Sequence, residues 1–149
     1  MKKIPNNNGA TLIEVLVASA LLILAVSGIL ISYLRCMELT ETARNMSRAV
    51  QAAQSRMEQI RSTTYANIVS THDNVGFAIP GLNGYGVSYV DDSQIDLLLV
   101  TISVSWEQKN GRICGEDQNL NGVLDSGEDA NSNGILDSSV MLMDRVYQR

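Results

Sequence analysis

The chain has 149 residues, enough for one domain beside its apolar N-terminal segment. Its 16 acidic and 11 basic residues give a formal net charge of −5, which argues against nucleic acid as a partner because phosphate binding needs a basic surface. No His, Cys or Ser stands in a triad-like or metal-hydrolase pattern, so we expect no enzymatic activity. The two cysteines, Cys36 and Cys114, are expected either to form a disulfide in an oxidising compartment or to remain buried or lipid-facing thiols.

A polar leader that carries two lysines ends at Gly9, and an apolar run follows that reaches Leu34. The only charge in this run is Glu14, five residues after the glycine. The uncharged part forms a helix about 30 Å long, which matches the hydrocarbon thickness of a bilayer. We therefore expect a transmembrane helix over 10–34. A carboxylate near the bilayer boundary is costly, so Glu14 either needs a partner or lies at the headgroup level of a plain membrane anchor.

This N-terminus resembles that of type IV pilins and of the pseudopilins of type II secretion. The resemblance implies that 1–9 is a leader removed by a prepilin peptidase, with cleavage after Gly9 and methylation of Ala10. It also implies that Glu14 neutralises the new N-terminus of a neighbouring subunit in a filament. Major pilins usually carry Phe where this chain has Ala10, which favours a minor subunit.

After Leu34, no Pro or Gly occurs up to Thr63, so we expect the same helix to continue to about Thr63. Spacings of three and four place five apolar residues on one helix face, which a sheet should cover. These residues are Met46, Val50, Ala53, Met57 and Ile60.

The next segment, Tyr65 to Ser93, is expected to be a loop with one short strand at Gly86–Val90, because glycines and prolines crowd its second half. His72 is expected to be a solvated loop residue. The clearest strand is Ile95–Trp106, where apolar and small polar residues alternate. Its apolar file should pack on the helix and its polar file should face outward. The apolar file is Leu98, Val100, Ile102, Val104 and Trp106, and the polar file is Thr101, Ser103 and Ser105.

The last strand is expected at Val140–Tyr147, with either of its two files facing inward. The fold class is therefore α+β: a long helix, half transmembrane and half amphipathic, packed on a small antiparallel sheet over the head, 35–149. The segment Ile102–Trp106 also resembles the V-x-V-x-W strand of minor pilins of the modification-protein type and of minor pseudopilins.

An acidic insert at 116–139 separates these two strands. Asp117–Glu128 fits the twelve-residue calcium loop D-x-[DN]-x-[DN]-G-x₅-E. Carboxylate, amide and carbonyl oxygens on a flexible loop favour Ca²⁺ over Mg²⁺ or transition metals. The expected ligands are Asp117, Asn119, Asn121, the carbonyl of Val123, Asp125 and Glu128.

The pattern repeats at a period of twelve. The expected ligands of the second loop are Asp129, Asn131, Asn133, the carbonyl of Ile135 and Asp137. Val140 stands where the closing acid belongs, so this loop should bind more weakly or take an oxygen from the first loop or from Glu116. The loops abut, which excludes a helix–loop–helix EF-hand and resembles thrombospondin type 3 repeats or dockerin loops. The alternative is a solvated, turn-rich acidic hairpin.

Together, these features suggest a minor pilin or pseudopilin that primes, caps or modifies a type IV pilus or related filament, with a Ca²⁺-stabilised head. Its expected partners are other pilin-like subunits, the prepilin peptidase and, before assembly, the inner membrane. The head would lie in the periplasm and later in a surface pilus or periplasmic pseudopilus. The alternative is a single-span calcium-binding surface protein that never polymerises and has no use for Glu14.

Overall fold

The computed structural model describes residues 11–148, so the expected cleavage and methylation site at Gly9 and Ala10 lies outside the described residues. Two helices and five strands follow one another along the chain. They are α1 (Leu12–Ser62), α2 (Tyr65–His72), β1 (Val75–Ala78), β2 (Gly84–Gln94), β3 (Leu97–Glu107), β4 (Ile113–Cys114) and β5 (Val140–Tyr147). The chain divides into two compact units, one up to Glu41 and one from Thr42 onward.

The first unit contains the N-terminal part of α1. Within the described residues, α1 is the one helix long and apolar enough to cross a membrane. Its most apolar stretch has a mean hydropathy of 2.7 and none of it is buried. By length and composition this segment is a candidate single span, as expected, and Cys36 lies in the same unit as an exposed free thiol.

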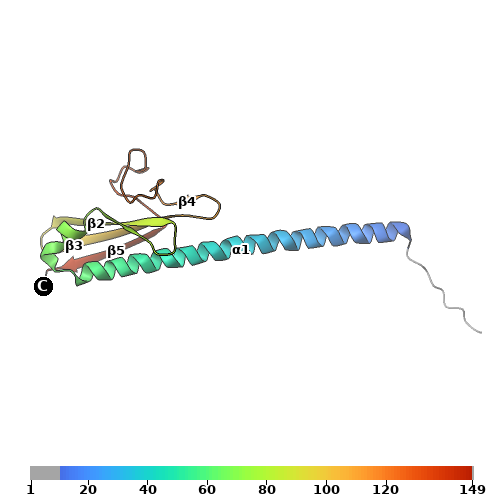
Figure 1. Cartoon of the computed structure of the whole chain (residues 1–149), viewed down its shortest axis with the longest axis horizontal. Coiled ribbons are helices and arrows are strands. Elements are labelled where there is room, and N and C mark those ends of the chain that lie inside the picture. Colours follow the sequence, from blue (N-terminus) through green and yellow to red (C-terminus); the bar gives the residue numbers. More distant parts are fainter. Residues whose placement is uncertain (1–10, 149) are drawn as a thin grey trace, which may run out of the picture. The chain divides into compact units, whose positions relative to one another are not determined.

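The second unit is an antiparallel sheet covered by the C-terminal part of α1 (Figure 1). The sheet order is β1-β2-β3-β4, and β5 also pairs with β3, from Leu97↔Tyr147 to Val104↔Val140. The expected α+β fold, a long helix packed on a small antiparallel sheet, is thus confirmed. Strand β3 lies at the centre, paired with β2 along one edge and with β4 and β5 along the other.

The core forms between α1 and the apolar file of β3, as predicted, since Leu98, Val100, Ile102, Val104 and Trp106 are all buried. On the helix side, the predicted face is right for Ala53, Met57 and Ile60 and wrong for the two residues before them. Met46 and Val50 are 46% and 37% exposed, and the buried face continues instead through Ala49. Alanines at these positions allow α1 to approach the sheet closely.

In β5, the file that faces the core is Val140, Leu142 and Val146, whereas Met143 and Tyr147 are exposed. This decides between the two files that the sequence left open. The buried Val140 therefore belongs to the core of the sheet, away from the loop whose last position it occupies in the sequence.

The prediction of a loop over 65–93 was wrong in most of its length. All the glycines and prolines lie at or after Gly76, so nothing prevents α2 from forming before them, and Ile68 anchors this helix in the core. His72 ends α2 and is buried, with its Nε2 atom 2.9 Å from the Thr63 hydroxyl. It is therefore not the solvated loop residue that the sequence suggested.

Strand β2 is longer than expected because two of its glycines permit close packing instead of breaking the strand. A Cβ atom on Gly84 would lie 2.5 Å from the carbonyl oxygen of Ser105, and one on Gly86 would overlap the ring of Phe77. Gly84 thus permits close backbone contact with β3, and Gly86 leaves room for the Phe77 ring.

Candidate metal centre

The acidic insert covers the face of the sheet opposite α1 (Figure 1). Tyr89 of β2 accepts a hydrogen bond from the backbone N–H of Leu136 (3.0 Å), and Ser138 donates one to the carbonyl of Val104. Gly115 packs directly on Ser105. The insert has no helix and consists of turns, in agreement with the exclusion of a helix–loop–helix arrangement.

This cover corrects one prediction about β3. Thr101, Ser103 and Ser105 were expected to face outward, yet all three are buried. They do point away from α1, but the insert takes them out of solvent. Small hydroxyl side chains suit this position because they leave room for the turns above them.

In the first loop, Asp117 lies at the centre and is 1% exposed. Its Oδ1 and Oδ2 atoms accept hydrogen bonds from the backbone N–H groups of Asn121 (3.1 Å) and Gly122 (2.8 Å). Gly122 has a φ of 72°, in the left-handed region that favours glycine, and a Cβ there would lie 2.6 Å from the Tyr85 ring. The sharp turn expected at this glycine is present.

Two amides of the same loop converge on one carboxylate oxygen. The Nδ2 atoms of Asn119 and Asn121 lie 2.7 and 2.8 Å from Oδ2 of Asp125. These hydrogen bonds lower the pKa of the Asp125 carboxyl because they favour its charged form, and the bond from Asn119 has the larger effect. Three of the predicted ligands are thus brought together.

The second loop repeats these contacts. Asp129 accepts from the N–H groups of Asn133 (3.0 Å) and Gly134 (2.8 Å). Asn131 and Asn133 place their Nδ2 atoms 2.5 and 3.0 Å from Oδ2 of Asp137. The seventh residues of the two loops, Val123 and Ile135, also make equivalent contacts. Their backbone N–H groups donate to the side-chain oxygens of Asn121 and Asn133.

Two glutamates close the loops in an equivalent way. Glu128 accepts hydrogen bonds from the N–H groups of Gln118 (2.8 Å) and Asp125 (3.0 Å), the second and ninth residues of the first loop. Glu116 accepts from those of Ala130 (3.2 Å) and Asp137 (2.8 Å), the second and ninth residues of the second loop. Glu116 therefore occupies the place that Val140 leaves empty in the sequence pattern.

The fit to a cation is incomplete in this arrangement. Among residues 11–148, no group of three or more His, Cys, Asp and Glu side chains is placed to hold one metal ion. The Asn side chains present nitrogen to Asp125 and Asp137, and this choice follows the local hydrogen-bond network. An amide rotation would place oxygen there, beside a carboxylate, an arrangement that a cation stabilises. The donor set therefore suits Ca²⁺ only after such a rotation.

The other predicted site residue, Glu14, lies in the first turn of α1 and is exposed. Its backbone N–H donates to the hydroxyl of Thr11 (3.3 Å), so the helix begins on a threonine cap. Within residues 11–148, no cation forms an ion pair with its carboxylate.

The chain matches no protein-family model, no curated protein and no solved structure.

Proposed function

We propose that this chain is a minor pilin or pseudopilin subunit that primes, caps or modifies a type IV pilus or a related filament. The observation that carries the proposal is Glu14, a carboxylate at the start of a long exposed apolar helix that continues into the core of an α+β head. A charge at this position is costly in a membrane, and the N-terminal amine of a neighbouring subunit would neutralise it.

The test is a Glu14→Leu variant in the native cell, with Glu38→Leu as the matched control farther along the same helix. We expect Glu14→Leu to leave membrane insertion intact and to reduce incorporation into filaments, because only the second step needs the charge. Glu38→Leu should change neither. Normal incorporation of Glu14→Leu would overturn the filament function and favour a non-polymerising, membrane-anchored protein.

Processing provides a second test. Mass spectrometry of the mature protein should find Ala10 at the N-terminus in cells that contain prepilin peptidase, and the leader should remain in cells that lack it. Detection of the unprocessed chain in both strains would contradict the proposal.

The proposal includes Ca²⁺ as the ligand of the tandem loops, held by the side chains of Asp117, Asp125 and Glu128 in the first loop and of Asp129, Asp137 and Glu116 in the second, with the Asn side chains between them. A bound cation would neutralise carboxylates that repel one another and so order the insert on the sheet. A soluble head from Thr42 onward contains the whole described core and is suited to the test. We expect millimolar Ca²⁺ to raise its melting temperature and Glu128→Ala to reduce that gain. An unchanged melting temperature would refute the calcium function.

A further inference from the structure

A groove of about 380 Å³ lies between α1 and the end of β1. Arg48 and Arg56 provide its charge, and Phe77 to Pro80 form an apolar wall. None of the described residues that line it is acidic, in a chain whose net charge is −5. The groove is thus a basic patch on an acidic protein.

Arg56 is held in this groove by contacts to uncharged groups. Its guanidinium carbon lies 5.3 Å from the centroid of the Phe77 ring, and its Nη2 atom donates to the Ser88 hydroxyl (3.3 Å). Its Nε atom is buried with no hydrogen-bond partner in the described part of the chain, and no described carboxylate pairs with it. Burial lowers the pKa of Arg56, since desolvation disfavours the charged form. A half-buried cation in this state is stabilised by an incoming anion.

Arg48 lies about two helical turns before Arg56 in α1 and lines the same groove. It donates to the carbonyl of Gly81 (2.8 Å), which fixes the guanidinium at the rim of the groove. Further N–H groups of this guanidinium remain available for a carboxylate, because arginine carries five donors.

Residues 92–96, here called the β2–β3 turn, comprise the last residues of β2 and the two residues before β3, and they carry acidic side chains. Asp92 and Asp96 are exposed there, and Ile95 is 92% exposed. The groove lies beside the middle of β2, because Phe77 pairs with Gly86 and Arg56 contacts Ser88. Asp92 lies four residues and Ile95 seven residues beyond Ser88, about 13 and about 23 Å farther along the chain. Within one head the turn therefore cannot reach its own groove.

We propose that the β2–β3 turn of a second copy docks in this groove, with Asp92 and Asp96 facing the two arginines and Ile95 against the apolar wall. Groove and turn are different, separate surfaces of the head. The contact is therefore heterologous and repeats from copy to copy, the type of contact that builds open filaments. It involves neither Glu14 nor the calcium loops, so it can fail while the proposed function stands.

The test uses the soluble head from Thr42 onward in sedimentation velocity over a wide concentration range. We expect self-association that weakens as salt is added, because charge pairs carry it. Arg56→Gln, Arg48→Gln and the double variant Asp92→Asn/Asp96→Asn should each weaken it at least tenfold. The exposed arginine of β5 provides the control, and Arg145→Gln should have no effect.

A mixture decides whether groove and turn meet each other. Arg48→Gln/Arg56→Gln keeps an intact turn, and Asp92→Asn/Asp96→Asn keeps an intact groove, so each alone should be monomeric and the two together should form a 1:1 dimer that does not grow. A wild-type head that stays monomeric would overturn the proposal, as would association that the variants leave unchanged or a mixture that fails to dimerise. A monomeric head whose groove binds glutarate would assign the groove to a free dicarboxylate instead.

Discussion

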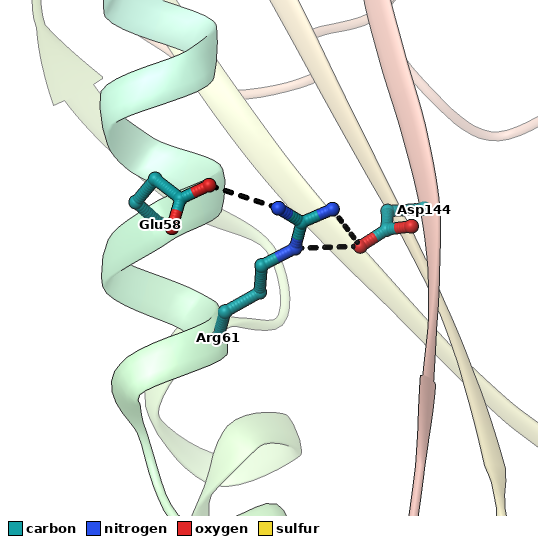
Figure 2. A network of polar contacts seen from close by, with 3 residues as sticks. All are labelled: Glu58, Arg61 and Asp144. Atoms are coloured by element: carbon teal, nitrogen blue, oxygen red, sulfur yellow. Dashed lines mark hydrogen bonds and ion pairs between the residues drawn. The ribbon is translucent and has the colours of Figure 1, made fainter.

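Arg61, in the last turn of α1, places two nitrogen atoms on a single carboxylate oxygen of Asp144 in β5 (Figure 2). The Nε and Nη2 atoms lie 2.9 and 2.8 Å from Oδ2 of Asp144, while Nη1 lies 2.8 Å from Glu58 on the same helix. The pKa of Arg61 is raised, mainly by its hydrogen bonding to Asp144 and then by the charge of that carboxylate. This contact ties the end of the helix to the last strand of the sheet.

We expect Asp144→Asn to lower the melting temperature of the head, and the loss should shrink in high salt because the Arg61 side chain is half exposed. Glu58→Gln is the matched control, since it removes a contact within one helix and leaves the link to β5 intact. Thermal melts of both variants at low and high salt measure the difference. An equal loss for the two would show that the link to β5 adds nothing.

His72 predicts a pH dependence of stability. Burial, and then the charge of Arg56, lower its pKa below the ordinary value near 6.5. The unfolded chain therefore binds a proton at a higher pH than the folded chain does, and the free energy of unfolding falls as the pH drops below about 6.5. Urea unfolding at pH 7.5 and pH 5.5 measures this fall, and His72→Gln should remove most of it. An identical slope in the variant would assign the dependence to carboxylates.

Gly84 and Gly86 predict unequal costs for the same substitution. The methyl group of Gly84→Ala would meet the backbone of Ser105, which the register of β2 and β3 holds in place. That of Gly86→Ala would meet the ring of Phe77, a half-buried side chain that is able to turn away. We expect losses of about 3 and about 1 kcal/mol respectively in urea unfolding. The reverse order would contradict this account of the glycines.

The fold was predictable where the signal is local. Alternation along β3 and the absence of helix breakers after Leu34 act over neighbouring residues, and both elements formed as expected. The errors are tertiary. Ser103 reads as a surface residue until a distant insert covers it, and α2 is too short for a periodic signal.

The candidate site was likewise predictable in its local contacts and not in its long-range ones. The twelve-residue pattern identified both loops, because their turns depend on residues two to five positions apart. Glu116, however, meets Asp137 across twenty-one positions, and the sequence offered it only as one of two sources of an oxygen. The arginine groove joins α1 to β1 and has no sequence signature.

The presence of one closing glutamate for each loop predicts the number of bound ions. In the proposed calcium site, Glu128 closes the first loop and Glu116 closes the second, so isothermal titration of the head should detect two Ca²⁺ ions. Glu116→Gln or Glu128→Gln should each weaken the binding of one ion at least tenfold, since the closing glutamate supplies two oxygens. Glu107→Gln, at a glutamate outside the insert, is the control and should keep both. Two unchanged ions in Glu116→Gln would refute the assignment of Glu116 while leaving the loops as calcium sites, and a wild-type head that binds no Ca²⁺ would refute the sites themselves.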